Sequence, residues 1–240
     1  MPDRDIPHRI EDRLIVALDV ANVDAARALL DRLGDAVSFF KLGPRLAFAA
    51  GFDGLVAELQ RRGKRIFLDV KLYDIGETVR EGVARVAERG IDFLTVHGDA
   101  EIMRAAVAGR AGAPLKIFAI TVLTSLGADG LADLGYHGPV EELVRLRARR
   151  AVECGVDGII AAPHDNPDAL RRHAGSPRLF VATPGVRLAG GALDDHKRAG
   201  TPRQALAAGA DYLIVGRPIV ASDDPAAAAR RIIDDMRGAA

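Results

Sequence analysis

The sequence lacks the features that define several classes of protein. It has one cysteine, Cys154, in 240 residues, which excludes an intrachain disulfide and a structural zinc site of several thiolates. We expect this cysteine, at the end of a predicted helix, to pack in the interior. Lys and Arg number 33, as do Asp and Glu, so the formal net charge is zero. We therefore expect no nucleic acid partner, and any anion site must be a local arrangement of charges.

Long apolar segments are also missing. No apolar run approaches the roughly 20 residues that cross a bilayer. The first residues, MPDRDIPHRIEDR, are polar and lack the apolar core of a signal peptide. We expect a cytoplasmic protein with no membrane partner. No Pro/Ser-rich linker or low-complexity tract divides the chain, so we expect one domain over residues 1–240, with residues 1–12 as a short polar extension.

What the sequence does contain is a series of short apolar runs separated by amphipathic stretches. Eight runs predict strands, at Leu14–Leu18, Val37–Leu42, Arg65–Val70, Asp92–Val96, Leu115–Val122, Gly158–Ala162, Leu179–Ala182 and Tyr212–Val215. The stretches after them predict helices, at Asp24–Leu33, Pro44–Arg62, Glu77–Arg89, Ala100–Ala111, Val140–Cys154, Pro202–Ala208 and in the alanine-rich tail.

This alternation predicts an α/β fold with a parallel sheet, and eight units favour a closed (β/α)8 TIM barrel. A doubly wound sheet usually has a glycine-rich loop after its first strand, whereas this first strand continues into LDVANVD. In a barrel of this kind, active residues lie at the C-terminal ends of the strands. Charged residues recur there: the first strand ends at Asp19, the second at Lys41 and the fourth at His97. Because His97 has no second ligand at metal spacing, we expect it to be a wall of the pocket.

The third strand, in FLDVKLYD, carries the densest group of charges. Side chains alternate along a strand, so Asp69 and Lys71 share one face and should point into the barrel mouth. Buried charges are costly unless paired, and Asp69, Lys71, Asp74 and Lys41 can pair in an alternating array. Such an array suits a reaction in which negative charge develops beside an ammonium group that also gives up a proton. The alternative is a structural ion-pair network that closes the top of the barrel.

Two loops at the predicted mouth combine glycine with arginine. TPGVRLAGG follows the seventh strand and contains Arg187, while VGRPIV follows the eighth and contains Gly216 and Arg217. Barrels often bind phosphate with these two loops, where backbone N–H groups approach the anion and arginine binds it with two hydrogen bonds. The alternative is an ordinary turn with a surface arginine. After the fifth strand, Thr124 and Ser125 either contact a polar ring or cap the next turn.

Six segments resemble those of one enzyme family. LIVALDV, FFKLG, FLDVKLYDIGETV, TVLTS, TPGVR and VGRPI follow one another as they do in orotidine 5′-monophosphate decarboxylases, from about Leu14 to Ile219. The centre of the resemblance is D-x-K-x-x-D-I-x-x-T. The resemblance implies a TIM barrel that converts orotidine 5′-monophosphate to UMP and CO2, the last step of de novo UMP synthesis. It also implies that neither a metal nor an organic cofactor takes part.

The resemblance further implies a role for each matching residue. Lys71 would donate a proton to C6 of the pyrimidine, with Asp69 near the departing carboxylate. Asp74 would come from the neighbouring subunit of a homodimer. Lys41 and Asp19 would hold the ribose hydroxyls. The remaining implied substrate contacts are Ile75, Thr78, Thr124, Ser125, Pro184, Arg187, His196, Gly216 and Arg217.

The chain departs from the family pattern at two places. Gly76 and Glu77 stand where Pro-Asn is common, and His196 stands where glutamine is frequent. Histidine still donates a hydrogen bond and would add pH dependence. Two other functions stay open: a related keto-gulonate phosphate decarboxylase or hexulose phosphate synthase that uses Mg2+, and a nucleotide-binding barrel without activity. The TVLTS and DIGET segments favour the pyrimidine enzyme over the first, and the complete charge array argues against the second.

Overall fold

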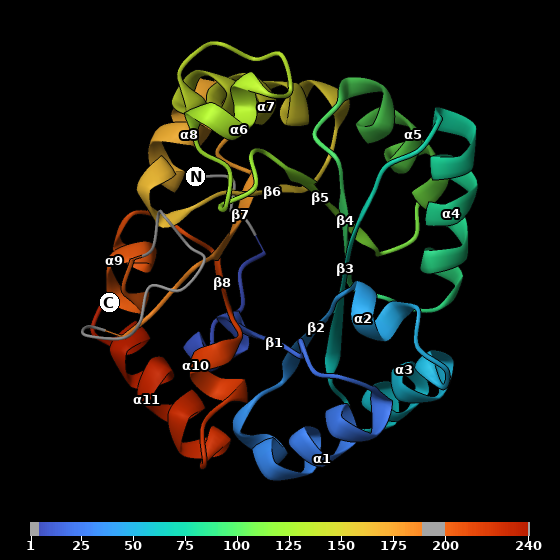
Figure 1. The fold of residues 1–240 in the computed structure, drawn as a ribbon, viewed down its shortest axis with the longest axis vertical. Coiled ribbons are helices and arrows are strands. Elements are labelled where there is room, and N and C mark those ends of the chain that lie inside the picture. The colour runs from blue at the N-terminus through green and yellow to red at the C-terminus, as the bar shows by residue number, and fades with distance from the viewer. Residues whose placement is uncertain (1–4, 189–199, 240) are drawn as a thin grey trace.

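Eight parallel strands close into a barrel in chain order, from β1 round to β8 (Figure 1). The structure is a computed structural model that describes residues 5–188 and 200–239. The strands are β1 Leu14–Ala17, β2 Phe39–Leu42, β3 Arg65–Leu72, β4 Phe93–Val96, β5 Lys116–Ile120, β6 Gly158–Ile160, β7 Phe180–Pro184 and β8 Tyr212–Val215. β1 pairs with β8 through Ile15 and Ile214, which closes the ring. The predicted (β/α)8 barrel is confirmed.

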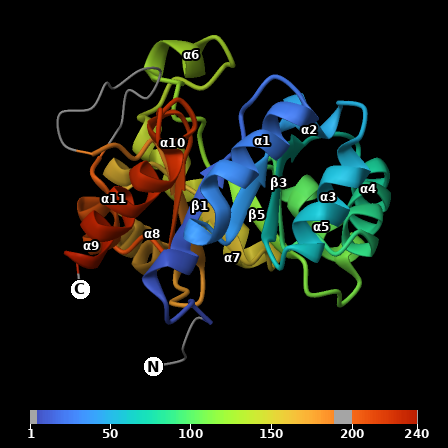
Figure 2. The same ribbon diagram turned by 90° about the horizontal axis from the view of Figure 1, so that it is seen from below.

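Helices surround the strands on the outside of the barrel (Figure 1). They are α1 Val23–Leu33, α2 Pro44–Ala47, α3 Phe52–Arg61, α4 Gly76–Glu88, α5 Ala100–Arg110, α6 Ala128–Ala132, α7 Val140–Cys154, α8 Pro167–Ala174, α9 Pro202–Ala207, α10 Arg217–Val220 and α11 Pro225–Arg237. Short 3-10 helices occupy Ile10–Arg13 (η1), Gly34–Ala36 (η2) and Pro163–Asp165 (η3). Figure 2 shows α6 at one end of the barrel. Among the residues described, no helix combines the length and apolarity that crossing a membrane requires.

Two sequence predictions about the elements need correction. The helix predicted over Pro44–Arg62 is two helices, because Gly51 adopts a left-handed φ of 84° at the N-cap of α3 and interrupts the helical path. The third strand is longer than predicted and ends at Leu72, not at Val70. The helices α6, α8 and α10 have eight residues or fewer, too few to produce a helical period in the sequence.

The strands separate two apolar layers. Rings from six strands fill the barrel interior. The ring centroid of Phe93 lies 4.9 Å from that of Phe39, 4.6 Å from that of Phe118 and 5.2 Å from that of Tyr212. Phe67 also belongs to this inner layer, whereas Ile66 and Leu68 pack outward against the helices. The predicted alternation along β3 is confirmed at these positions. Charges above this apolar interior must find partners at the barrel mouth.

Three connections from a helix into an even-numbered strand share a Gly-x-Asp sequence. They are Gly90-Ile91-Asp92 before β4, Gly155-Val156-Asp157 before β6 and Gly209-Ala210-Asp211 before β8. Each glycine has a positive φ, of 64°, 77° and 98° respectively, which ends the helix in a left-handed turn. Each aspartate accepts a hydrogen bond from a backbone N–H of the preceding strand, at 2.7–2.8 Å. Each aspartate also pairs with an arginine: Arg65, Arg110 or Arg171.

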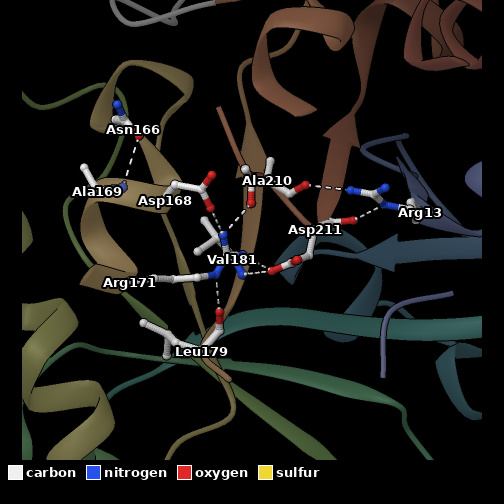
Figure 3. A network of polar contacts seen from close by, with 10 residues as sticks. Arg13, Asn166, Asp168, Ala169, Arg171, Leu179, Val181, Ala210 and Asp211 are labelled. Atoms are coloured by element: carbon white, nitrogen blue, oxygen red, sulfur yellow. Dashed lines mark hydrogen bonds and ion pairs between the residues drawn. The ribbon is translucent and has the colours of Figure 1, made fainter. Parts of the chain in front are cut away.

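The most buried of these pairs joins Arg171 of α8 to Asp211, in the network of Figure 3. The Nε of Arg171 donates to the carbonyl of Leu179 at 2.8 Å, and its Nη1 donates to Asp168 at 2.9 Å. Arg13 of η1 donates to the carbonyl of Asp211 at 2.8 Å. Within the expected N-terminal extension, Ile6 packs against the inner layer. This network therefore ties the beginning of the chain to the last strands.

Candidate active site

A cavity of about 690 Å³ lies at the C-terminal ends of the strands, within the size range of small-molecule sites. Nine residues predicted from the sequence line it: Asp19, Lys41, Asp69, Lys71, Thr124, Pro184, Arg187, Gly216 and Arg217. They come from six of the eight strand ends or the loops after them. The fold thus brings Asp19 and Arg217, which are 198 positions apart in the sequence, to one cavity, as their predicted places at strand ends indicate.

Four of these residues form a line of alternating charge. The Lys41 Nζ lies 3.3 Å from an oxygen of Asp19 and 3.1 Å from Oδ2 of Asp69. The other oxygen of Asp69, Oδ1, accepts a hydrogen bond from the Lys71 Nζ at 2.9 Å. The side chains of Lys41 and Asp69 are 9% and 12% exposed, whereas that of Lys71 is 38% exposed. Lys71 is therefore the cation at the accessible end of this charge array, Asp19–Lys41–Asp69–Lys71.

The array keeps its charges in spite of burial. Burial opposes the negative charge of Asp69, but the ammonium groups of Lys41 and Lys71 outweigh it and hold the pKa of this carboxyl below its usual value. Burial likewise opposes the charge of Lys41, but Asp69 and Asp19 outweigh it and raise the pKa of this ammonium group. The cavity thus holds a fixed carboxylate between two cations.

The array depends on backbone geometry that the sequence did not reveal. A Cβ on Gly43 would lie 3.1 Å from an Asp19 oxygen and 3.6 Å from the Lys41 Nζ, so glycine leaves room for this pair. Lys71 has a left-handed φ of 50°, at an irregularity in the pairing of β3 with β4. The hydroxyl of Thr95 contacts both Asp69 and Lys71 there. Alternation from Phe93 would have placed Thr95 on the inward face.

The loops after β7 and β8 bring arginine side chains to the same cavity. Arg187, after β7, is buried, and its Nη1 donates to the carbonyl of Val186 at 2.8 Å. Gly216 is the N-cap of α10, and Arg217 is the first residue of that helix. Both predicted arginines therefore reach the cavity from the expected loops. Arg45 of α2 also lines it and was missed by the sequence analysis, because a lone arginine in a helix gives no distinguishing pattern.

Several predicted residues do not line this cavity. Asp74 is exposed after β3 and accepts a hydrogen bond from the backbone N–H of Ile75 at 2.7 Å, so the expectation that Asp74 joins the array of its own chain is wrong. Ile75 is 71% exposed, and Thr78 is exposed on α4. All three residues come after the end of β3 at Leu72, so the alternation along that strand does not place them. Ser125 is also exposed and outside the lining.

The histidines contribute little to the described cavity. His97 contacts Asp99 at 2.8 Å, and its ring centroid lies 4.5 Å from that of Tyr73. It does not line the cavity, so the expectation that it forms a pocket wall is wrong. His196 lies outside the described residues. Within residues 5–188 and 200–239, no group of three or more His, Cys, Asp or Glu side chains is arranged to hold a metal ion.

Comparisons with known proteins agree on one family. The family model described as orotidine 5′-phosphate decarboxylase / HUMPS matches residues 12–232. The orotidine 5′-phosphate decarboxylase of Nitrobacter winogradskyi is 50% identical over 228 residues, which cover 95% of this chain and 94% of the relative. That of Caulobacter vibrioides is 47% identical over 230 residues, covering 95% and 98%. The crystal structure of the Lactobacillus acidophilus enzyme superposes with a TM-score of 0.81 at 34% identity, covering 94% of this chain and 99% of that one.

Proposed function

Because the chain belongs to the orotidine 5′-phosphate decarboxylase / HUMPS family, we propose that it decarboxylates orotidine 5′-monophosphate to UMP and CO2. It is then a carboxy-lyase of pyrimidine biosynthesis, at the last step of de novo UMP synthesis. The observation that carries the proposal is the charge array at the cavity, with Lys71 at its accessible end.

Lys71 is the proton donor in this reaction. The bond between C6 of the pyrimidine and its carboxylate breaks, CO2 leaves and the electron pair remains at C6. The ammonium group of Lys71 gives a proton to C6, and the neutral amine then recovers a proton from water. A fixed ammonium group at a partly buried site stabilises the developing negative charge, so the reaction needs no cofactor. Asp69 lies near the departing carboxylate and holds Lys71 in place.

The rest of the cavity binds the nucleotide. Asp19 and Lys41 hold the ribose hydroxyls, and Thr124 and Pro184 contact the substrate beside the ring. Arg187, Gly216 and Arg217 bind the phosphate, which is supported by their place on the loops after β7 and β8. Ser125 and His196 complete the contacts of the base and the phosphate. Binding energy from the remote phosphate holds the reacting groups in position.

A second copy of the chain completes the site. Asp74, Ile75 and Thr78 do not line the cavity of their own chain, yet they belong to the motif that carries the family resemblance. Tyr73 and Ile75, on either side of Asp74, are 65% and 71% exposed. Large apolar side chains at a surface are typical of protein interfaces. In the homodimer, Asp74 therefore serves the neighbouring cavity.

A spectrophotometric assay tests this function. In the presence of EDTA, we expect the purified protein to convert orotidine 5′-monophosphate to UMP, and Lys71→Ala to lose the activity while keeping its melting temperature. Lys116→Ala is the matched control. Lys116 is the first residue of β5, at the end of the strand away from the cavity, and its ammonium group lies over the ring of Phe180. Near-normal kcat in Lys71→Ala would contradict the role of Lys71. UMP binding without turnover would indicate a silent barrel, and Mg2+-dependent turnover of a sugar phosphate would indicate the related enzymes.

A further inference from the structure

The hydroxyl of Thr95, on β4, contacts both Asp69 and Lys71 of β3. We infer that Thr95 is a positioning residue, whose hydroxyl fixes both the Asp69 carboxylate and the Lys71 backbone so that the Lys71 ammonium group meets C6 of the substrate. This inference rests on the proposed function and adds to it a residue that does not line the cavity.

The pairing of β3 with β4 changes register beside Thr95. Leu68 pairs with Leu94 and Leu72 pairs with Val96, so four steps along β3 match two along β4. The extra length lies at Asp69, Val70 and Lys71, opposite Thr95. Such a bulge leaves backbone groups without their regular strand partners and redirects side chains.

The Thr95 hydroxyl forms two hydrogen bonds with residues of the bulge. It accepts one from the backbone N–H of Lys71 at 2.9 Å and donates one to Oδ1 of Asp69 at 2.8 Å. Thr95 is fully buried, at 0% exposure, so water does not replace either bond. Oδ1 is also the oxygen that accepts from the Lys71 Nζ. One hydroxyl thus joins the backbone and the carboxylate that together orient the ammonium group.

The backbone of Lys71 needs this support. Its φ of 50° is left-handed, a conformation that residues with a Cβ rarely adopt without compensating contacts. If the N–H bond to Thr95 is lost, the backbone at Lys71 is free to relax towards ordinary strand geometry. The ammonium group would then move relative to Asp69 and the substrate, and small displacements of reacting groups are costly in rate.

Three variants separate positioning from simple packing. Thr95→Val keeps the shape and removes both hydrogen bonds, whereas Thr95→Ser keeps the hydroxyl. Thr183→Val is the matched control, because Thr183 is also fully buried and its hydroxyl has no hydrogen-bond partner among the described residues. We expect Thr95→Val to lower kcat by about tenfold to a hundredfold with little change in KM. Thr95→Ser and Thr183→Val should stay near the wild type.

The pH profile gives a readout that a packing defect would not change. Lys41 from β2 and Lys71 from β3 face the Asp69 carboxylate, Asp19 from β1 faces it through Lys41, and Thr95 is its uncharged neighbour on β4. Without the hydroxyl, the carboxylate loses a stabilising donor and the pKa of Asp69 rises. The acid limb of kcat/KM should therefore move to higher pH in Thr95→Val and return in Thr95→Ser. Any contribution from titration of the substrate is the same in all variants, so a difference between their acid limbs comes from the protein.

The outcomes distinguish this inference from the proposed function. Wild-type protein that does not decarboxylate orotidine 5′-monophosphate contradicts the function. An active wild type with kcat and acid limb unchanged in Thr95→Val overturns the role of Thr95. NMR titration of the Asp69 carboxyl tests the contact without turnover: a raised pKa in Thr95→Val supports it, and an unchanged pKa overturns it. If Thr95→Val does not fold, Thr95→Cys takes its place, because a thiol is a weak donor and acceptor.

Discussion

Asp69 keeps its negative charge where burial opposes it, because Lys41 and Lys71 lie on either side. A carboxyl whose pKa is lowered on folding stabilises the fold above its unfolded pKa, and that stability is lost as pH falls through the folded value. The raised pKa of Lys41 acts in the opposite direction: its stabilisation is present below the unfolded pKa and is lost as pH rises through the folded value. Between these limits, across neutral pH, the array holds together.

Lys41→Met tests this electrostatic balance. The substitution leaves Asp69 with one cation, so we expect a loss of roughly 2 kcal/mol in the free energy of unfolding at pH 7. The loss should shrink at acid pH, where the Asp69 carboxyl takes up a proton and no longer needs Lys41. Urea denaturation at pH 7 and in acid measures both values, with Lys116→Met as the control. A loss that does not vary with pH would contradict the balance.

Arg217→Ala tests the anion side of the cavity. Charged hydrogen bonds to a phosphate are strong, so we expect kcat/KM for orotidine 5′-monophosphate to fall by about tenfold to a hundredfold, mainly through KM. The melting temperature should change little, because Arg217 lies in a short helix at the barrel mouth. Arg149→Ala on α7, where the arginine is half exposed, is the control. An unchanged kcat/KM would count against phosphate binding at this residue.

Single residues were predictable where a local rule applied. Asp69 and Lys71 follow from alternation along one strand, and Arg217 follows from its place after the last strand. Thr95 and Gly43 were missed because their importance arises from contacts between strands, with Asp69 in one case and Asp19 in the other. Asp74 was instead expected in the array and does not join it. Its spacing from Lys71 suggested one cluster, but β3 ends between the two residues. Register and strand ends are not visible in a local pattern.

At the scale of elements, the Gly-x-Asp connections secure the end of the barrel opposite the cavity. Each aspartate links the strand it precedes to the one before it, and each arginine partner adds a second link. The three aspartate side chains differ in exposure: Asp211 is 1% exposed, Asp157 23% and Asp92 35%. The cost of removing a charge from an ion pair grows with burial, because the remaining partner is left without solvent.

Substitution of these aspartates by asparagine should therefore give a graded series. We expect Asp211→Asn to cost about 3 kcal/mol or more and Asp92→Asn about 1 kcal/mol or less, with Asp157→Asn between them. Asparagine still accepts a hydrogen bond from the strand backbone, so the series isolates the charge. Urea denaturation gives the order, and kcat should stay near that of the wild type in all three. Equal losses at the three positions would contradict the dependence on burial.

Strands were easier to predict than helices in this chain. The run Tyr212–Val215 matches β8 at both ends, because a buried parallel strand is a continuous apolar segment. The helix predicted over Pro44–Arg62 is interrupted at residues 48–51, between α2 and α3, and only Gly51 of these four has a left-handed φ. Helices α6 and α10 have only five and four residues, too few to give a helical pattern in the sequence.

At the scale of the whole molecule, the ion pairs that stabilise the barrel and the residues of the candidate site lie at opposite ends. Ion pairs at one end join neighbouring strands, while the array and the arginines gather at the other end around one cavity. The family and the barrel could be predicted from ordered motifs along the chain. The proposed relation between two copies comes from the family resemblance alone, because a local sequence pattern does not indicate which chain would supply Asp74.

The proposed sharing of Lys71 and Asp74 between two chains predicts that two inactive variants restore one another. Lys71→Ala and Asp74→Ala should each be inactive as homodimers. Their hybrid has one cavity with both residues intact and one with neither, so it should show roughly half the activity of the wild-type dimer. Separate affinity tags on the two chains allow the hybrid to be purified after co-expression. A hybrid of Lys71→Ala with the double variant is the control, because every cavity in it lacks Lys71.

The turnover of orotidine 5′-monophosphate by the purified hybrid is the most direct test that Lys71 of one chain and Asp74 of another form a single reaction site. Recovery to roughly half the wild-type kcat per dimer, with an inactive control hybrid, is the expected result. A hybrid as inactive as its parents, or full activity in Asp74→Ala alone, would contradict it.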